Sequence, residues 1–319
     1  MGRVRWTDRP YSRGVSFLTV IGYRGIGRPP PAPKFIWVEC LGRPHLSFRM
    51  PDYRARYNLP YVRRPKSRWG NAGVLAGQLP RALRRFGPWD TFRFGTQAIC
   101  AEYLARIRAS RRIFVVDGQT YRYLPTYGTN ERIIEIPYAI DFVGRHAVSG
   151  ARMLEVGNVL VGHLDYPRDV VDRYEQAPGI LNRDIRTFIP SAPYDIVVSI
   201  STVEHVGWDE PEVELLGAPS AIENLYCNCL AEGGDMLISV PLGYNPAVDA
   251  MFSGGNPLGI GRSVFLRRVS AFNEWEQIQF QPSQRELVFP EYSSRYIAAN
   301  LLAFWEVSKP RSPADCTVS

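Results

Sequence analysis

The sequence has few of the residues that mark disulfide-bonded, metal-binding or membrane-spanning proteins. Its 319 residues include only five cysteines and four histidines, and both sets are scattered along the chain. An odd number of dispersed cysteines predicts neither a disulfide framework nor a zinc site, so we expect a reduced, cytoplasmic protein. The longest early apolar run, residues 14–23, is too short to span a bilayer and carries no cleavage pattern. The sequence therefore predicts neither a signal peptide nor a membrane anchor.

Several catalytic motifs are absent as well. The chain has no nucleotide-kinase phosphate loop, no serine nucleophile elbow and no zinc-binding histidine pair. A dinucleotide-binding fingerprint needs three glycines after the first strand, whereas residues 157–162 read Gly-Asn-Val-Leu-Val-Gly. These absences argue against hydrolases, metalloenzymes and dinucleotide-dependent oxidoreductases.

Charge divides the chain into a basic and an acidic half. Residues 1–150 contain 26 Lys and Arg against 9 Asp and Glu, whereas residues 151–319 contain 12 against 22. Almost all the positive charge is arginine, as a GC-rich genome would produce, and a basic half can also dock on its acidic neighbour. The alternative is that the basic half attracts nucleic acid or a phosphate-bearing ligand.

The N-terminal region, residues 1–130, is rich in Arg and Pro and predicts a partly irregular extension that acts as a lid or recognises an acceptor. Within it, residues 112–116 read as a strand that enters a turn at Gly118. Pro137 fits the start of a helix that ends before Gly150. An earlier helix between residues 91 and 110 is indicated by the spacing of Ile99, Tyr103 and Ile107.

After residue 150, short apolar runs typical of strands buried on both faces follow one another: 153–156, 169–172, 195–200 and 236–240. Residues 220–223 match a helix capping box, and a helix beginning there would connect the last two strands in parallel. Its apolar stripe comprises Ile222, Leu225, Tyr226 and Cys229. Because Cys227 and Cys229 would lie on different faces of that helix, we do not expect them to bind a metal together.

Polar residues follow these strands at their carboxyl ends, where open parallel sheets bind ligands. Gly157 would let a ligand approach the backbone closely. Asp172 can accept hydrogen bonds from a ribose, and Asp184 can accept one from an exocyclic amine. The plainer alternative is that each aspartate only caps a turn.

In this order and spacing, the chain resembles the class I S-adenosylmethionine-dependent methyltransferases, and within them a small-molecule, type-11-like branch. The resemblance covers residues 131–307 and implies a doubly wound, mostly parallel, seven-stranded Rossmann-like α/β sheet, followed by a tail at 308–319. The final antiparallel pair would be 263–268 and 298–307. The resemblance rests on residues 153–157, Asp172, 182–184, 194–199, 203–206 and 230–239.

The resemblance also implies S-adenosylmethionine as the cofactor. The loop after the first strand departs from the family, because Val159 and Val161 stand where further glycines are usual. The short spacing from Gly157 to Asp172 predicts a short or irregular first crossover. The cofactor-binding residues that the resemblance implies are Glu155, Gly157, Asp172, Asp184, Ile185 and Ser201.

For the acceptor, His205 is the candidate general base, because its unperturbed pKa of about 6.5 lets it take a proton near neutrality. The alternative is that it only caps or packs a helix. The candidate substrate-binding residues are Trp208, Tyr244, Asn245 and Asp249.

The sequence thus predicts methyl transfer to an oxygen or nitrogen of a small molecule, such as a sugar or secondary metabolite. An anionic acceptor would suit the arginines of the N-terminal region. The Asn/Asp-Pro-Pro-aromatic tetrapeptide of base-amino methyltransferases is absent after residue 200, which argues against base methylation. Two alternatives remain: a non-catalytic binding protein on the same fold, and an RNA methyltransferase that binds through its arginine-rich region.

Overall fold

The computed structural model describes residues 80, 83–84, 87–97, 112–124, 130–279 and 289–311. The chain divides into two compact units, Met1–Ser47 and Phe48–Ser319, and every described residue lies in the second. The expected helix stripe at residues 99–107 lies outside the described residues, as do most of the arginine-rich region and the end of the tail. The domain boundary at residue 130 stays a prediction.

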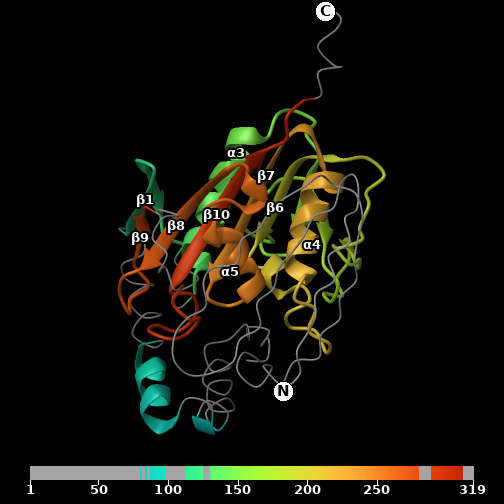
Figure 1. The fold of residues 1–319 in the computed structure, drawn as a ribbon. Coiled ribbons are helices and arrows are strands. Elements are labelled where there is room, and N and C mark those ends of the chain that lie inside the picture. The colour runs from blue at the N-terminus through green and yellow to red at the C-terminus, as the bar shows by residue number, and fades with distance from the viewer. Residues whose placement is uncertain are drawn as a thin grey trace, which may run out of the picture. The chain divides into compact units, whose positions relative to one another are not determined.

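A single mixed sheet of eight strands organises the described part of the chain (Figure 1). Five strands run parallel at one side, β10 is antiparallel to both β7 and β8, and β9 is antiparallel to β8. In spatial order the strands are β5 (Ile180–Leu181), β4 (Asp169–Val171), β3 (Met153–Val156), β6 (Tyr194–Ile200), β7 (Leu230–Leu242), β10 (Leu301–Ser308), β8 (Arg262–Arg268) and β9 (Trp275–Ile278).

The predicted sheet is therefore confirmed in type but wrong in strand count. The final antiparallel pair exists as β8 and β10, with Leu302 opposite Leu266. The eighth strand, β9, extends the sheet at its far edge. Its sequence, Trp-Glu-Gln-Ile, is short and mostly polar, with two exposed residues, and so gives little apolar signal.

The strands read as apolar runs because both of their faces are buried. Leu154 and Val156 of β3 contribute to one hydrophobic core, whereas Met153 contributes to the other. The same alternation holds in β6, where Val197 lies in the first core and Ile196 in the second. A sheet covered on both faces needs no polar residue along its central strands.

Helices cover both faces, as a doubly wound fold requires. In Figure 1, α4 (Gly217–Asn224) and α5 (Pro246–Ser253) lie in front of the sheet and α3 (Arg132–His146) lies behind it. The first core contains apolar residues of α4 and α5, and the second contains those of α3. The hairpin of β1 (Ile113–Val116) and β2 (Gln119–Arg122) adds Phe114 and Tyr121 to the second core.

Two expected helix starts are wrong. Helix α3 begins at Arg132, five positions before Pro137, because Ile133, Ile134 and Ile136 bury completely in the second core. One proline removes only one backbone donor, and packing outweighs that loss.

Helix α4 begins at Gly217, so Ser220 lies inside it rather than at its cap. A side chain at Gly217 would meet the carbonyl oxygen of Val206 at 2.6 Å, so this start depends on a close backbone contact. The helix continues as a π-helical turn, η3 (Leu225–Cys229), and its predicted stripe is confirmed at Ile222, Leu225 and Cys229, all fully buried.

The connection from β3 to β4 contains no helix between residues 157 and 168, which confirms the irregular crossover. Leu160 is fully buried there and packs in the second core. The burial of Leu160 therefore anchors the connection to the core.

Candidate functional site

The carboxyl ends of β3, β4, β6 and β7 meet at one edge of the sheet, because these strands are parallel neighbours. Gly157, Asp172, Ser201 and Gly243 follow them directly. The sequence predicted a ligand site at this edge, and its candidate residues do lie around it. Their contacts separate them into distinct groups.

Glu155 is 1% exposed and organises the loop after β3. Its Oε1 atom accepts hydrogen bonds from the backbone N–H groups of Val159 and Leu160, at 2.7 and 2.6 Å. Its Oε2 atom lies 2.5 Å from Nε of Arg168. Both oxygens therefore have protein partners, and any contact of Glu155 with a cofactor stays a prediction.

Gly157 has a left-handed backbone, with φ of +79°, and closely approaches a side chain. A Cβ atom at this position would lie 2.4 Å from Oγ1 of Thr202. That hydroxyl donates to the carbonyl oxygen of Ile200 at 2.8 Å. The space beside the glycine is thus occupied by Thr202, a residue that the sequence did not single out, and not by Val159 or Val161.

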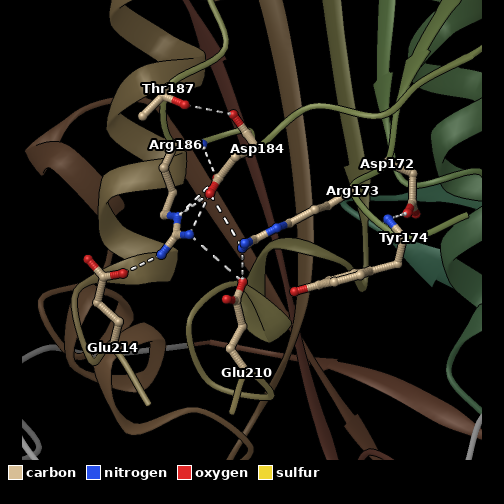
Figure 2. Close-up of polar contacts among 8 residues, drawn as sticks. All are labelled: Asp172, Arg173, Tyr174, Asp184, Arg186, Thr187, Glu210 and Glu214. Atoms are coloured by element: carbon tan, nitrogen blue, oxygen red, sulfur yellow. Dashed lines mark hydrogen bonds and ion pairs between the residues drawn. The ribbon is translucent and has the colours of Figure 1, made fainter. Parts of the chain in front are cut away.

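Asp172 caps the turn that follows β4. Its Oδ1 atom accepts a hydrogen bond from the backbone N–H group of Tyr174 at 2.8 Å (Figure 2). The same atom accepts one from the backbone N–H group of Glu175, also at 2.8 Å. The side chain of Asn182 donates to the backbone carbonyl of Asp172 at 2.9 Å, which joins the ends of β4 and β5. The turn-cap alternative therefore holds for one of the two carboxylate oxygens.

Asp184 lies in a separate group of ion pairs, which we call the arginine cluster: Arg173, Asp184, Arg186, Glu210 and Glu214 (Figure 2). Nε of Arg186 donates to both carboxylate oxygens of Asp184, at 2.9 and 3.0 Å, and Nη1 of the same arginine pairs with Glu214. Nη1 of Arg173 lies 2.6 Å from Oε1 of Glu210 and 3.4 Å from Oδ2 of Asp184.

The arginines dominate the electrostatics of this cluster. Partial burial raises the pKa of Asp184, but the hydrogen bonds and charge of Arg186 and the charge of Arg173 outweigh it, so the pKa is lowered. Figure 2 shows Asp184 directed toward the two arginines and Asp172 directed toward the backbone of Tyr174. The structure does not bring the two carboxylates together on one ligand.

The fit to S-adenosylmethionine is best at the ribose position. In the described residues, no hydrogen bond engages the second carboxylate oxygen of Asp172, which leaves an acceptor for a hydroxyl at the end of β4. Ile185 is 5% exposed and belongs to the first hydrophobic core, so only a small part of its side chain is open to a ligand. At the glycine and at Asp184, a ligand would have to replace contacts with Thr202 and Arg186.

A second group lies beyond β6 and β7, which we call the buried carboxylates: Glu135 of α3 and Glu204 of η2 (Val203–His205). Both side chains are 0% exposed. Oε1 of Glu135 accepts hydrogen bonds from the hydroxyls of Ser201 and Ser239, at 2.6 and 2.7 Å. Neither Oε2 of Glu135 nor either carboxylate oxygen of Glu204 has a hydrogen-bond partner in the part of the chain that the structure describes.

Burial controls the protonation of both carboxylates. It raises the pKa of Glu204 to about 7, opposed chiefly by the charge of His205. It also raises the pKa of Glu135, assisted by the charge of Glu131 and opposed by the hydrogen bonds from Ser201 and Ser239. Ser201, predicted to contact the cofactor, thus directs its hydroxyl to Glu135, from a left-handed backbone with φ of 40°.

His205 lies beside these carboxylates with 46% of its side chain exposed. Its Nδ1 atom is 2.6 Å from Oδ2 of Asp209 and 3.2 Å from the hydroxyl of Tyr244, which itself donates to Asp209. Its Nε2 atom is 3.5 Å from Oε1 of Glu204, longer than a good hydrogen bond. Burial lowers the pKa of His205, but the charges of Glu204 and Asp209 outweigh it, so the pKa is raised.

The other predicted substrate residues have structural contacts at the same edge. Asn245 is 1% exposed and caps α5 by accepting the N–H of Ala247, while its amide donates to the backbone carbonyl of Glu204 at 2.7 Å. Oδ1 of Asp249 accepts the N–H of Gly243, and burial raises the pKa of Asp249 to about 7. Trp208 is 8% exposed, so only its margin is available to a ligand. Their roles in substrate binding stay predictions.

Glu135 is the residue that the sequence analysis missed. The available signal was a single carboxylate in the otherwise apolar run of residues 133–140. Such a residue is either paired or functional when it is buried. Among the described residues, no group of three or more His, Cys, Asp or Glu side chains could hold a metal ion. No helix in the described ranges is long and apolar enough to cross a membrane.

No protein-family model and no curated protein sequence matches this chain. Solved structures that match include class I S-adenosylmethionine-dependent methyltransferases of small molecules. The amino pentose methyltransferase CalS10 from Micromonospora echinaspora is 19% identical with a TM-score of 0.25, and the match covers 33% of this chain and 48% of CalS10. The chain thus spans about half the length of that protein.

Two further matches cover more of this chain. The N-methyltransferase NodS from Bradyrhizobium japonicum is 13% identical with a TM-score of 0.30, over 55% of this chain and 87% of NodS. A possible exported protein from Bordetella parapertussis is 14% identical with a TM-score of 0.34, over 77% of this chain and 100% of that protein. CalS10 was solved with S-adenosylmethionine, and NodS with S-adenosylhomocysteine. At these identities and scores, the function must be argued from the residues of this chain.

Proposed function

We propose that this protein is an S-adenosylmethionine-dependent methyltransferase that acts on an oxygen or nitrogen of a small molecule, such as a sugar or secondary metabolite. The observation that carries the proposal is the sheet order. Five parallel strands are followed by β10, which lies antiparallel between β7 and β8, and β9 is antiparallel to β8. The pair of β8 and β10 is the final antiparallel pair that the sequence resemblance implies. The candidate residues lie at the edge where such a sheet binds its ligand.

The end of β4 would hold the cofactor. The second carboxylate oxygen of Asp172 would accept hydrogen bonds from the ribose, and Ile185 would pack against the adenine. When bound, S-adenosylmethionine supplies a methyl carbon activated by a sulfonium charge. The chain's own task is to align an acceptor atom and to manage its proton.

His205 is the proposed proton-handling residue. It is exposed enough to reach an acceptor, and Asp209 fixes its ring through Nδ1. Nε2, which lies 3.5 Å from Oε1 of Glu204, would be the nitrogen that takes the proton. Because the neighbouring carboxylates raise its pKa, His205 acts as a base only where the pH exceeds that raised value. The cytoplasmic location and the anionic character of the acceptor remain proposals from the sequence.

Calorimetry with S-adenosylmethionine tests the proposal. The wild type should bind, and Asp172→Asn should bind at least about tenfold more weakly, which is about 1.4 kcal/mol. The amide oxygen keeps the turn cap at Tyr174 and Glu175, so the variant removes the charge and one acceptor. The control is Asp165→Ala, which removes an exposed carboxylate of the neighbouring connection. Unchanged affinity of Asp172→Asn would contradict the ribose assignment.

The second candidate is a non-catalytic binding protein on the same fold. Two observations favour it: Thr202 occupies the space beside Gly157, and Arg186 occupies both carboxylate oxygens of Asp184. This candidate predicts no heat and no thermal shift with millimolar S-adenosylmethionine. An RNA methyltransferase remains a third possibility; most of the arginine-rich region on which it depends lies outside the described residues.

A further inference from the structure

We propose that Tyr244 and Asp209 are positioning residues for His205. Tyr244 orients the carboxylate of Asp209, and that carboxylate keeps the ring hydrogen of neutral His205 on Nδ1 and the lone pair on Nε2. We call these three residues the His205 triad. The arrangement follows from its own contacts, and only its use in methyl transfer rests on the proposed function.

The hydrogen-bond distances are the first observation. Nδ1 of His205 lies 2.6 Å from Oδ2 of Asp209, and the hydroxyl of Tyr244 lies 2.8 and 2.7 Å from the two carboxylate oxygens. The contact between Nδ1 and that hydroxyl is longer, at 3.2 Å. An ionised carboxylate only accepts hydrogen bonds, so both neighbours donate to Asp209. Neutral His205 therefore carries its hydrogen on Nδ1.

The backbone between His205 and Asp209 is the second observation. The N–H group of Asp209 donates to the carbonyl oxygen of His205 at 3.1 Å. Gly207, between them, has φ of +74°, and a Cβ atom there would lie 2.5 Å from the carbonyl oxygen of Glu214. This closely packed turn brings the carboxylate back to the imidazole from which the chain has just come.

The third observation is that Tyr244 is buried where His205 is accessible. Tyr244 is 7% exposed, whereas the side chain of His205 is 46% exposed. The ring of Tyr244 meets those of His205 and Tyr292 edge-on, with centroids 5.0 and 5.2 Å apart. Its single hydroxyl hydrogen is directed to Asp209. An acceptor would thus contact His205, and Tyr244 would act through it.

Glu204 competes with Asp209 for the ring hydrogen. The charged and titratable groups that act on His205 are Glu204 of its own 3-10 turn, Asp209, Tyr244, and Arg132 of α3. Oε1 of Glu204 lies 3.5 Å from Nε2, against 2.6 Å from Asp209 to Nδ1. Charge-assisted hydrogen bonds are strong only at short distance, so Asp209 decides where the hydrogen lies.

The fixed hydrogen determines which nitrogen can act as the base. The proton of the acceptor would move to Nε2, and the electron pair that it leaves would stay on the acceptor atom. The hydrogen on Nδ1 would stay bonded to Asp209, whose charge stabilises the resulting imidazolium. Asp209 and Tyr244 would thus promote proton transfer without touching the acceptor.

Nitrogen-15 NMR of protein with labelled histidine tests the proposal. The chain has four histidines, so the signal that disappears in His205→Gln identifies this residue. Above the raised pKa of His205, the shifts of the two ring nitrogens show which one carries the hydrogen. The wild type should carry it mainly on Nδ1.

Asp209→Asn should move the hydrogen mainly to Nε2. Tyr244 still donates to the amide oxygen, so the amide nitrogen faces Nδ1 and donates to it. The lost negative charge should also lower the pKa of His205 by about one unit or more, a tenfold weaker affinity for the proton. A wild-type spectrum that shows the hydrogen mainly on Nε2, or an Asp209→Asn spectrum and pKa like those of the wild type, would overturn the proposal.

Tyr244→Phe tests the hydroxyl alone, because it keeps the ring that packs on His205. The share of hydrogen on Nδ1 should fall below that of the wild type and stay above that of Asp209→Asn. An unchanged share would overturn the role assigned to Tyr244. Glu212→Gln is the matched control, since it removes an exposed carboxylate of the same loop, and it should leave the spectrum as in the wild type.

The same samples separate this inference from the proposed function. Neither Asp209 nor Tyr244 is among the proposed cofactor residues, so both variants should bind S-adenosylmethionine as the wild type does. The predicted ring hydrogen without cofactor binding would refute the methyltransferase and leave the His205 triad standing. Cofactor binding with the hydrogen on Nε2 in the wild type would refute the triad alone.

Discussion

The arginine cluster and the buried carboxylates lie at the same edge of one sheet, but their acidic groups differ in partners and in the direction of their pKa shifts. In the arginine cluster, Asp184 is partly exposed, has arginine partners for both oxygens and has a lowered pKa. Among the buried carboxylates, Glu204 is inaccessible, has no hydrogen-bond partner in the described chain and has a raised pKa.

The difference teaches which acidic groups stabilise the fold and which are available for a ligand. Paired carboxylates join the connections after β4, β5 and η2 to one another, so their interactions are already satisfied. An unpaired buried carboxylate weakens the folded state unless it stays protonated or gains a cation. On this comparison the carboxylates of the arginine cluster are satisfied within the fold, whereas three oxygens of the buried carboxylates have no hydrogen-bond donor in the described residues.

The largest expected effect on the free energy of unfolding comes from removing the arginine partner of a buried carboxylate. Arg168→Ala would leave Glu155, 1% exposed, without its guanidinium partner. Breaking a buried ion pair from one side costs about 3–5 kcal/mol. Denaturant unfolding should therefore show that loss in the free energy of unfolding. Arg183→Ala, at an exposed position, should change it little, and an equally small loss in both variants would contradict the assignment.

The next-largest effect, expected for Glu204→Gln, is a gain rather than a loss in the free energy of unfolding. The ordinary pKa of Glu204 is 4.5 and its folded value is about 7, so between these values the folded state keeps a proton that the unfolded state has lost. The wild type should lose roughly 3 kcal/mol of stability as the pH rises through this window.

Glu204→Gln removes this titration. The variant should exceed the wild type in free energy of unfolding by up to roughly 3 kcal/mol at about pH 8, and the gain should nearly vanish below the ordinary pKa of 4.5, at about pH 3.5. Denaturant unfolding at both pH values measures it. A pH-independent difference between the two proteins would show that the carboxylate does not titrate in this range.

The smallest effect is expected in the arginine cluster. Arg186 and Asp184 remain partly exposed, so Arg186→Ala should cost only about 1 kcal/mol, and less at high salt. Because the pKa of Asp184 is lowered, its contribution is present above its ordinary value of 3.8 and is lost as the pH falls through the lower folded value. Unfolding at neutral and acid pH checks this. A loss as large as that of Arg168→Ala would show that the partly exposed arginine cluster contributes as much to stability as the buried pair of Arg168 and Glu155.

Much of the fold could be predicted from the sequence, because buried parallel strands leave a local signal. The runs at 153–156 and 195–200 became β3 and β6, and the final antiparallel pair became β8 and β10. The helix starts were less predictable. Gly217 begins α4 because its backbone packs against Gly207, a contact that a capping pattern at residues 220–223 does not report.

The candidate site was predictable in position but not in partners. Its residues were placed at the correct edge, since each follows a predicted strand. The partners were not predictable, because Glu135 meets Ser201 and Ser239 across 66 and 104 positions of the chain. Thr202 occupies the space beside Gly157 for the same reason.

The sequence by itself determined the layered architecture, because the burial of each strand is encoded in its own few residues. Only the tertiary structure decided which acidic side chains find a partner. That outcome depends on how the ends of β4, β6 and β7 and the start of α3 meet at one edge. Asp184 meets an arginine there, and Glu204 meets none that donates to it among the described residues. A charge is stabilised or destabilised by its neighbours in space, and distant segments of the chain supply those neighbours only after folding.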